Sequence, residues 1–331
     1  MEALDSEVPL PKPMKVAGIV YNLKKEQDSG VIDAEAEYDN IETVHAIRQA
    51  LEEGGLRTEL LEADEFLFDK LRRNSIDMVF NIAEGMSGRG REAQIPALLN
   101  MLGIPFTGSD ETTLCLALDK ALTKRLLATY HIRTPKYAVI SSGRASCLSR
   151  LHYPIIIKPN AEGSSKGISD LSIVESPAAL HELVERNLAM YEGDMLAEEY
   201  IEGREFTVGL LGNGSETRVF RPMEIVYECE TQNSYHVYSY SVKQDFQRYV
   251  HYECPATLSC EIEREMMDAA RKVYDILGCR DCARVDFRLA SDGKIYFIEI
   301  NPLPGLAPGY SDYPMLAAYC GLPYGELVRS V

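Results

Sequence analysis

The sequence lacks any hydrophobic run close to the roughly 20 residues that a membrane-spanning helix needs. Its first residues, MEALDSEVPLPKP, are acidic and proline-rich, whereas a secretory signal begins with a basic and then an apolar stretch. Both absences argue against insertion into a membrane or export across it. We therefore expect a cytoplasmic protein with no membrane partner.

Positive charge is also scarce, since 34 lysines and arginines stand against 51 aspartates and glutamates, for a formal net charge of −17. Such a surface repels phosphate backbones, so nucleic acid is not an expected partner. An anionic ligand would need a local group of lysines, arginines or backbone amides. With 46% hydrophobic and 26% charged residues, the chain has the composition of a globular protein of two or three domains.

The signatures of three common kinds of site are absent. The eight cysteines are scattered along the chain, and the CxxC of Cys279 and Cys282 has no second pair at zinc spacing. The six histidines form neither HxxxH nor HExxH. No GxxxxGK[ST] occurs, and no GxGxxG follows the first predicted strand. Disulfide frameworks, transition-metal sites, P-loops and Rossmann nucleotide sites are therefore all disfavoured.

Strands and helices alternate in the first third of the sequence. Lys15–Tyr21 (KVAGIVY) is a short β-branched run, and an apolar stripe from Ile41 to Leu51 predicts a helix that ends at Gly54 and Gly55. The next expected elements are a strand, a helix and a strand at residues 56–61, 62–73 and 77–81. This order predicts an α/β domain with a parallel sheet.

The rest of the chain predicts mixed α+β structure. Helices are expected at residues 92–102, 111–129, 177–190 and 259–277. Strands are expected at residues 154–159, 171–174, 195–200, 204–211, 283–289 and 295–300. The stretch Glu228–Pro255 is polar, tyrosine-rich and longer than an ordinary connection, which favours a functional loop such as a lid.

A loop of small residues, Asn160–Gly167 (NAEGSSKG), joins two of these strands. Its glycines and serines would let backbone N–H groups approach a phosphate closely. Taken alone, the loop is equally well interpreted as a plain hairpin turn. Lys120, on a helix, and Lys158, at the end of the apolar strand IIIK, would add positive charge, although an isolated lysine is usually solvated. Phosphate binding is predicted only by the loop, the lysines and nearby carboxylates together.

Four polar residues, Arg284, Asp286, Glu299 and Asn301, alternate with apolar ones on two predicted strands around the turn Ser291–Gly293. Residues two apart on a strand share a face, and the turn brings the strands together. Two carboxylates and an amide then offer the oxygen ligands that Mg²⁺ prefers. The alternative, a solvated hairpin of alternating charge, is disfavoured because charges among core-type neighbours are costly to pack.

Seven segments carry a resemblance to a known family. In chain order they are FNIAEG, GIPFTGSD, DKALTK, IIIKPNAEGSSKGI, LAEEYIEGREFTVGLL, ARVDF and IEINPLPG. Their order and spacing resemble the D-alanine–D-alanine ligase family of ATP-grasp enzymes, over nearly the whole chain. The resemblance implies an α/β protein with the ATP-grasp fold, in which an N-terminal parallel α/β domain is followed by two α+β domains that clasp ATP. The implied domains are residues 1–112, 113–203 and 204–331.

The resemblance also implies a nucleotide site. Lys120 and Lys158 would contact the ATP phosphates, and the backbone amides of Ser164 and Ser165 would close over them. Glu205 would hold the ribose hydroxyls. The hinge that recognises adenine, through the Glu198 carboxylate and backbone groups, would consist of Glu198, Glu199, Tyr200 and Ile201.

The implied chemistry is ligation. Asp286, Glu299 and Asn301 would bind two Mg²⁺ ions, Arg284 would stabilise the tetrahedral intermediate, and Lys243 resembles the lysine of the family's mobile loop. ATP would convert a carboxylate into an acyl phosphate, which an amine attacks to form an amide, with release of ADP and phosphate. The partners would be amino acids or related small molecules, and a homodimer is a further expectation from the family.

The substrate side departs from the family pattern. In the family, a glutamate near the first strand, the first serine of the glycine loop and a tyrosine after the mobile-loop lysine form a hydrogen-bonded set. Glu35 and Ser164 fill the first two places here. Gln244 replaces the tyrosine and cannot supply a phenolic hydroxyl, so the first substrate site is expected to differ.

Two further departures concern the same side. The family's histidine-glycine pair is Glu84-Gly85 in this chain, and the acidic residue five positions later is Arg89, which predicts an inverted charge pair. The loop that follows Asn301 is one residue longer than in the family. The residues then expected at the second substrate are Gly305, Tyr310 and Ser311.

The sequence therefore predicts an ATP-dependent carboxylate–amine ligase, similar to D-alanine–D-alanine ligases, that forms an amide (dipeptide) bond and whose substrates need not be two D-alanines. An alternative is a ligase that joins an amino acid to a non-amino-acid acceptor in a biosynthetic pathway, as in mycosporine synthesis. A nucleotide-binding module without turnover is disfavoured, because Arg284 and the three metal-ligand candidates are all present. A kinase that only phosphorylates a carboxylate is a weaker reading.

Overall fold

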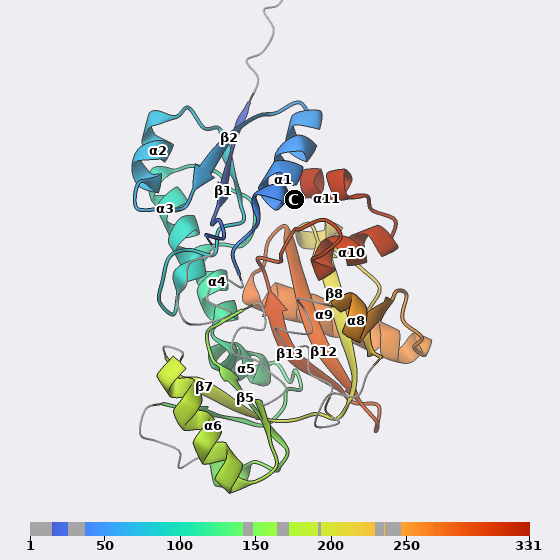
Figure 1. Cartoon of the computed structure of the whole chain (residues 1–331). Helices are drawn as coiled ribbons and strands as arrows, with labels where there is room; N and C mark the ends of the chain where they lie inside the picture. The colour runs from blue at the N-terminus through green and yellow to red at the C-terminus, as the bar shows by residue number, and fades with distance from the viewer. Residues whose placement is uncertain are drawn as a thin grey trace, which may run out of the picture.

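The computed structural model describes residues 15–25, 37–141, 148–163, 172–190, 193–228, 235 and 246–331. Three sheets organise this part of the chain, one after another in sequence (Figure 1). The first sheet is parallel, whereas every strand pair in the other two is antiparallel. This change of pairing matches the predicted passage from α/β to α+β structure.

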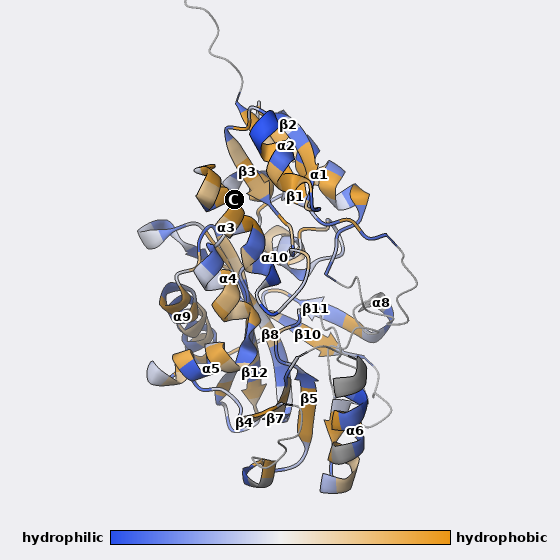
Figure 2. Ribbon diagram, turned by 90° about the vertical axis from the view of Figure 1, so that its left-hand side faces the viewer, coloured by the Kyte–Doolittle hydropathy of each residue, from blue (hydrophilic) through white to orange (hydrophobic). Residues whose placement is uncertain are grey.

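The first sheet has the strand order β2-β1-β3. Its strands are β1 (Val16–Tyr21), β2 (Arg57–Glu62) and β3 (Met78–Asn81), and its helices are α1 (Ile41–Glu53), α2 (Leu67–Arg73) and α3 (Gln94–Leu102). Figure 2 shows that α1 carries both hydrophilic and hydrophobic residues, as a helix with one buried face must. The prediction of a parallel sheet is confirmed. The helix predicted from residue 62 begins only at Leu67, because strand β2 continues to Glu62.

The helix predicted over residues 111–129 is wrong as a single element, because it breaks at Asp119 into α4 (Glu111–Leu118) and α5 (Lys120–Thr129). Asp119 has extended backbone angles, φ −83° and ψ 96°. Its carboxylate accepts hydrogen bonds from the backbone N–H of Leu122 at 2.9 Å and from Asn160 Nδ2 at 2.9 Å. An aspartate that caps the first turn of a helix favours a new helix start over continuation of the old one.

The second sheet has the order β4-β7-β5-β6 and is covered by α6 (Pro177–Met190), which lies alongside it in Figure 1. Its strands are β4 (Tyr137–Ile140), β5 (Ile155–Pro159), β6 (Ile173–Val174) and β7 (Met195–Glu199). Strand β4 was not among the predicted strands. The sheet has an apolar cluster of its own, drawn from residues 138–197.

The third sheet has the order β11-β10-β8-β12-β13, with β9 paired to β8. Its strands are β8 (Gly203–Leu211), β9 (Arg218–Val219), β10 (Met223–Tyr227), β11 (Val250–Glu253), β12 (Cys282–Ala290) and β13 (Ile295–Asn301). Helix α9 (Cys260–Leu277) packs on it through a cluster that includes Met266 and Val285. The predicted loop Glu228–Pro255 is wrong at its end, where α8 (Phe246–Tyr249) and β11 form and β11 pairs with β10.

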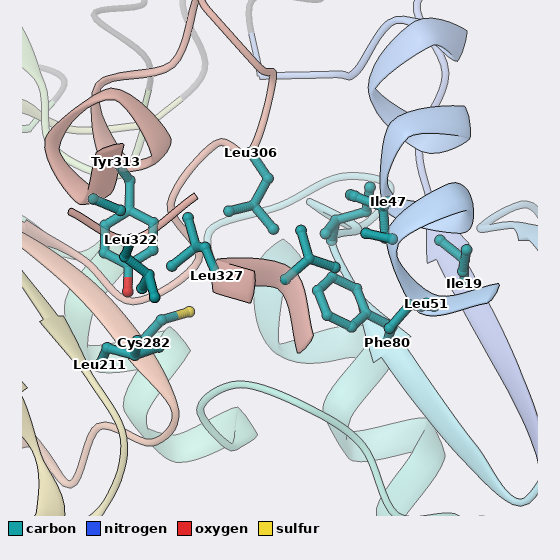
Figure 3. Close-up of a cluster of buried hydrophobic side chains, with 14 of the residues drawn as sticks. Ile19, Ile47, Leu51, Phe80, Leu211, Cys282, Leu306, Tyr313, Leu322 and Leu327 are labelled. Atoms are coloured by element: carbon teal, nitrogen blue, oxygen red, sulfur yellow. The ribbon is translucent and has the colours of Figure 1, made fainter. Parts of the chain in front are cut away.

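The end of the chain returns to the first sheet. Helices α10 (Asp312–Tyr319) and α11 (Tyr324–Ser330) follow β13, and α11 packs against α1. Figure 3 shows Ile47 and Leu51 of α1 in one apolar cluster with Leu322 and Leu327. The loop between β13 and α10 is thereby held beside the first sheet.

The two cysteines of the CxxC sequence are core residues. Cys279 and Cys282 are free thiols and buried, and burial raises the pKa of Cys279 to about 12. Such thiols are poor nucleophiles and poor metal ligands at neutral pH. Within the described residues, no helix combines the length and the apolar character needed to cross a membrane.

Candidate active site

One cavity is lined by residues of the second and third sheets and by segments that flank the first sheet. It brings together every predicted site residue that falls in the described part of the chain. These are Glu84, Lys120, Lys158, Glu198, Glu199, Tyr200, Ile201, Glu205, Arg284, Asp286, Glu299, Asn301, Gly305, Tyr310 and Ser311. The predicted residues Glu35, Ser164, Ser165, Lys243 and Gln244 lie outside the described residues.

The hairpin of β12 and β13 forms one wall of the cavity. Its register places Arg284 opposite Asn301 and Asp286 opposite Glu299, as the alternation of residues predicted. Asn301 Nδ2 donates a hydrogen bond to Asp286 Oδ2 at 3.2 Å. Two carboxylates and one amide oxygen therefore gather on one face of the hairpin. Because hard oxygen donors suit Mg²⁺, this donor set fits the ion that the family resemblance implies.

Arg284 is fixed by two carboxylates. Its Nε and Nη2 donate to the two oxygens of Asp286, both at 3.0 Å, and its Nη1 lies 3.2 Å from Asp312 Oδ2. Burial favours the neutral guanidine, but Asp286 and Asp312 raise the pKa of Arg284 above its usual value. The guanidinium is thus held charged and in one orientation beside the hairpin. Sequence reasoning missed Asp312, whose only local signal is its place at the first turn of α10, after Ser311.

A buried carboxylate joins two buried lysines on another wall. Glu198 Oε1 lies 2.7 Å from Lys124 Nζ, and Glu198 Oε2 lies 2.6 Å from Lys158 Nζ. Burial lowers the pKa of Lys124 to about 8, although Glu198 opposes the shift. Burial would raise the pKa of Glu198, but the two lysines lower it. Lys124 was missed in the sequence, where it looks like an ordinary helix lysine within DKALTK.

Lys120 lies between the glycine-loop region and the hairpin. Its Nζ donates to the carbonyl oxygen of Glu162 at 2.5 Å and lies 3.5 Å from Glu299 Oε2. Burial opposes ionisation of Glu299, but Lys120 and Lys158 lower the pKa of this carboxyl to about 2. Glu299 is therefore a carboxylate at neutral pH, as a metal ligand must be.

The end of β7 and the strand β8 form a third part of the cavity. Glu205 Oε2 accepts hydrogen bonds from Tyr227 Oη at 2.8 Å and from Arg288 Nη2 at 2.7 Å. Arg288 Nη1 lies 3.1 Å from Tyr200 Oη, and the guanidinium carbon is 5.1 Å from the centre of the Tyr200 ring. Arg288 faces Glu205 across the β12–β8 register, so the strands set this contact. Neither Arg288 nor Tyr227 was predicted.

Acidic side chains gather where the cavity meets the first sheet. One carboxylate oxygen from each of Glu37, Glu84 and Glu92 lies within 4.8 Å of the other two. Arg91 Nη2 donates to both oxygens of Glu37, at 2.5 and 2.7 Å, and lies 3.2 Å from Glu162 Oε2. Sequence reasoning missed Glu37, Arg91 and Glu92.

The predicted inverted charge pair of Glu84 and Arg89 is wrong. Arg89 Nη2 lies 2.6 Å from Asp119 Oδ2, and its side chain is 67% exposed. The arginine two positions later, Arg91, is buried instead and contacts Glu37 and Glu162, which line the cavity. The short 3₁₀ turn Arg91–Ala93 decides which of the two side chains points inward, and no sequence periodicity marks that turn.

Comparisons with known proteins agree over most of the chain. Residues 128–331 match the family model described as D-ala D-ala ligase C-terminus. The D-alanine–D-alanine ligase of Cupriavidus pinatubonensis is 35% identical over 264 residues, which are 79% of this chain and 76% of that protein. The crystal structure of the Bacillus anthracis D-alanine–D-alanine ligase complexed with ATP has a TM-score of 0.75 at 21% identity and covers 96% of both chains. The crystal structure of the VanG D-Ala:D-Ser ligase from Enterococcus faecalis has a TM-score of 0.74 at 21% identity and covers 96% of this chain and 98% of that chain.

Proposed function

Because this chain belongs to the D-alanine–D-alanine ligase family of ATP-grasp enzymes, we propose that it joins a carboxylate to an amine through an acyl phosphate, using substrates other than two D-alanines. The expected ATP-grasp fold and the ATP-dependent ligase class are confirmed by the comparisons. The observation that supports the ligase chemistry is the cavity that joins a lysine set, a hinge and an Arg–Asp–Glu–Asn hairpin. The proposed change of substrate rests on Gln244 and Glu84, where the sequence departs from the family.

The nucleotide would lie between the second and third sheets. The backbone of residues 198–201 would face the adenine. Glu205, oriented by Tyr227 and Arg288, would accept hydrogen bonds from the ribose hydroxyls. Lys120 and Lys158 would bind the phosphates. Asp286, Glu299 and Asn301 would hold two Mg²⁺ ions, which supply Lewis-acid charge stabilisation when bound.

The reaction would proceed in two steps. A carboxylate oxygen of the first substrate attacks the γ-phosphorus of ATP, the bond to ADP breaks, and an acyl phosphate forms. The amine of the second substrate then attacks the carbonyl carbon and loses a proton, and inorganic phosphate leaves as the amide forms. Arg284, already held in place by Asp286 and Asp312, would stabilise the negative charge that develops on the carbonyl oxygen.

The second substrate would lie against the loop before α10. Ser311 is the residue before the first turn of that helix, and its Oγ accepts a hydrogen bond from the backbone N–H of Ala307 at 3.2 Å. A Cβ at Gly305 would come within 2.8 Å of Ser311 Oγ, so glycine keeps this loop open. We assign Gly305, Tyr310 and Ser311 to the carboxylate of the second substrate. The homodimer that the family resemblance implies stays a prediction.

The first test is phosphate release from magnesium ATP over a panel of single and paired D- and L-amino acids, with mass analysis of the products. We expect an amide product from a pair other than two D-alanines. Robust release with D-alanine alone would overturn the proposed change of substrate and leave the ligase class intact.

The metal site is tested separately. Glu299→Gln should abolish phosphate release and leave the far-ultraviolet circular dichroism spectrum unchanged. Asp292→Asn, at the exposed tip of the same hairpin, is the matched control and should release phosphate at the wild-type rate. Unchanged release by Glu299→Gln would show that the metal site has been placed on the wrong residues.

A further inference from the structure

We propose that Cys254 and Cys320 form a site of reversible oxidation, at which a peroxide converts the two thiols into a disulfide and a dithiol reductant restores them. The two cysteines lie far apart in the sequence and meet only in the folded protein. The inference goes beyond the proposed function and does not depend on it, because neither cysteine lines the cavity.

Two elements that are already in contact carry the cysteines. Cys254 directly follows β11, and Cys320 directly follows α10. Tyr252 Oη, on β11, donates a hydrogen bond to Asp312 Oδ1, on α10, at 2.9 Å. Both cysteines also pack against the apolar cluster that contains Leu322. A disulfide would therefore join two elements that the fold already holds together.

The segment from β9 to β10 lies against both cysteines. On one side, β11 pairs with β10, and the backbone N–H two residues after Cys254 donates to the carbonyl oxygen of Pro222 at 3.2 Å. On the other side, Arg218 Nη2 donates to the carbonyl oxygen of Cys320 at 2.7 Å. The backbone N–H of Arg221 hydrogen-bonds to the Cys320 sulfur. This shared segment fixes the positions of the two cysteines relative to each other.

The two side chains meet sulfur to sulfur. The thiols of Cys254 and Cys320 share a hydrogen bond, so only a short approach separates them from a covalent bond. Both residues are partly exposed free thiols, which a small oxidant can reach. Cys279 and Cys282 form the CxxC of the sequence, but both are buried. The cysteine pair suited to oxidation is thus the one that the fold assembles.

The surroundings stabilise one thiolate within the pair. The hydrogen bond from Cys254 lowers the pKa of Cys320 to about 6, although burial opposes this shift. The N–H of Arg221 and the guanidinium groups of Arg218 and Arg221 act in the same direction. Arg221 Nη2 also donates to Glu263 of α9 at 3.0 Å, so its charge is shared. The same thiol contact and burial raise the pKa of Cys254. At neutral pH, Cys320 is therefore the thiolate and Cys254 the thiol.

A thiolate beside a thiol is the arrangement that disulfide formation needs. The sulfur of Cys320 attacks one oxygen of hydrogen peroxide, the O–O bond breaks, and the departing hydroxide takes up a proton, which leaves a sulfenic acid and water. The sulfur of Cys254 then attacks the sulfenic sulfur. The S–O bond breaks, and the thiol proton leaves with the hydroxide as a second water. Two electrons pass from the sulfurs to the peroxide, and a dithiol such as dithiothreitol returns them.

The experiment is peptide mapping of the full chain after oxidation. Reduced protein at pH 7 is treated with a small excess of hydrogen peroxide, digested with trypsin without reduction and analysed by mass spectrometry. We expect a linked pair of peptides, residues 249–264 and 295–329, which dithiothreitol separates. Cys254→Ser and Cys320→Ser should remove the link. Cys260 lies in the first of these peptides, so Cys260→Ser is the matched control and should keep the link.

Two further measurements test the separate roles of the cysteines. In Cys254→Ser, the sulfenic acid on Cys320 has no resolving thiol, so dimedone should trap it there. In the reduced native protein at pH 7, iodoacetamide should label Cys320 about tenfold more slowly in Cys254→Ala than in the wild type, because the variant lacks the hydrogen bond that stabilises the thiolate. Two cysteines that only fill space would show neither effect.

Absence of the linked peptides from the oxidised wild-type protein would overturn the inference, and this result requires no variant to fold. A link that Cys260→Ser removes would also overturn it, because the disulfide would then involve Cys260. Phosphate release is measured under reducing conditions, so failure of this inference leaves the ligase proposal intact. Failure of the ligase proposal would likewise leave the peptide map unchanged.

Discussion

Lys124 Nζ and Glu198 Oε1 lie 2.7 Å apart in the interior, where neither side chain is more than 2% exposed. Lys124 comes from α5 and Glu198 from β7, and the second oxygen of Glu198 holds Lys158 of β5. The carboxylate therefore ties a helix to two strands and fixes one of the lysines assigned to phosphate binding. A change in this pair should affect stability first and catalysis second.

Lys124→Met should lower the free energy of unfolding by about 3 kcal/mol, because removal of one partner from a buried ion pair leaves its charge undercompensated. Urea denaturation measures the change. Lys136→Met is the matched control, since Lys136 is 64% exposed and 3.6 Å from Glu199, and it should cost less than about 1 kcal/mol. Equal effects of the two substitutions would contradict the importance of burial.

Gly85→Ala should prevent folding or cost more than about 3 kcal/mol. Gly85 has φ of 82°, and an added Cβ would lie 2.0 Å from the carbonyl oxygen of Arg91. Gly88→Ala is the control, because Gly88 has φ of 88° but nothing lies within 4 Å of the added Cβ. We expect this substitution to lower the free energy of unfolding by only about 1 kcal/mol. Urea denaturation compares them, and equal stabilities would remove the steric argument.

Tyr227→Phe should raise the KM for ATP about three- to tenfold with little change in kcat, because it removes the 2.8 Å hydrogen bond that orients Glu205. Arg288→Met should do the same more strongly, since it removes a charged donor. Steady-state phosphate release measures both constants. Tyr130→Phe, on an exposed tyrosine, should leave both unchanged. A fall in kcat at constant KM would place Glu205 outside ribose binding.

The free energy of unfolding of the wild-type protein should fall as the pH rises from about 4.5 to 8, and Glu92→Gln should make this fall smaller. The folded-state pKa of Glu92, about 8, lies above its ordinary value of 4.5, so the folded state binds more protons in this window and the free energy of unfolding falls as pH rises. Glutamine cannot ionise. At pH 8.5 the variant should therefore be more stable by roughly 4 kcal/mol, with no gain below pH 4.5.

Urea denaturation at pH 4.5, 6.5 and 8.5 measures that difference, with Glu65→Gln as the control that should follow the wild-type pH dependence. An unchanged dependence in Glu92→Gln would show that this carboxyl ionises normally in the folded protein. The expected gain also means that the ionised form of Glu92 destabilises the folded protein.

The hairpin site was predictable from sequence because strands alternate their faces with a period of two. Arg284, Asp286, Glu299 and Asn301 needed only that period and the turn at Gly293 to be placed together. The nucleotide lysines were candidates from the sequence pattern, and the hinge came from the family resemblance. The structure brings both to the same cavity. Their chemical roles stay predictions.

What the sequence did not predict depends on contacts between distant segments. The break at Asp119 depends on Asn160, 41 residues away, while the apolar periodicity on both sides suggests one helix. The buried Lys124 finds its partners in Glu198, Thr134 and the carbonyl of Ile298, all of which lie on other segments. Arg91 and Arg89 are chemically alike, and the local turn alone separates their roles. The apolar periodicity of a helix or strand predicts which of its faces is buried. It does not predict which distant segment packs against that face.

The packing of α11 on α1 bears on how the protein is made. One face of the first sheet is covered by residues near it in sequence, such as Leu67 and Leu99. Its other face needs Leu327 and Val328. As the chain emerges from the ribosome, the apolar face of α1 therefore stays uncovered until α11 has been synthesised, near the end of translation. The second sheet, whose cluster spans only residues 138–197, can close much earlier, so the first sheet to be synthesised is among the last to be completed.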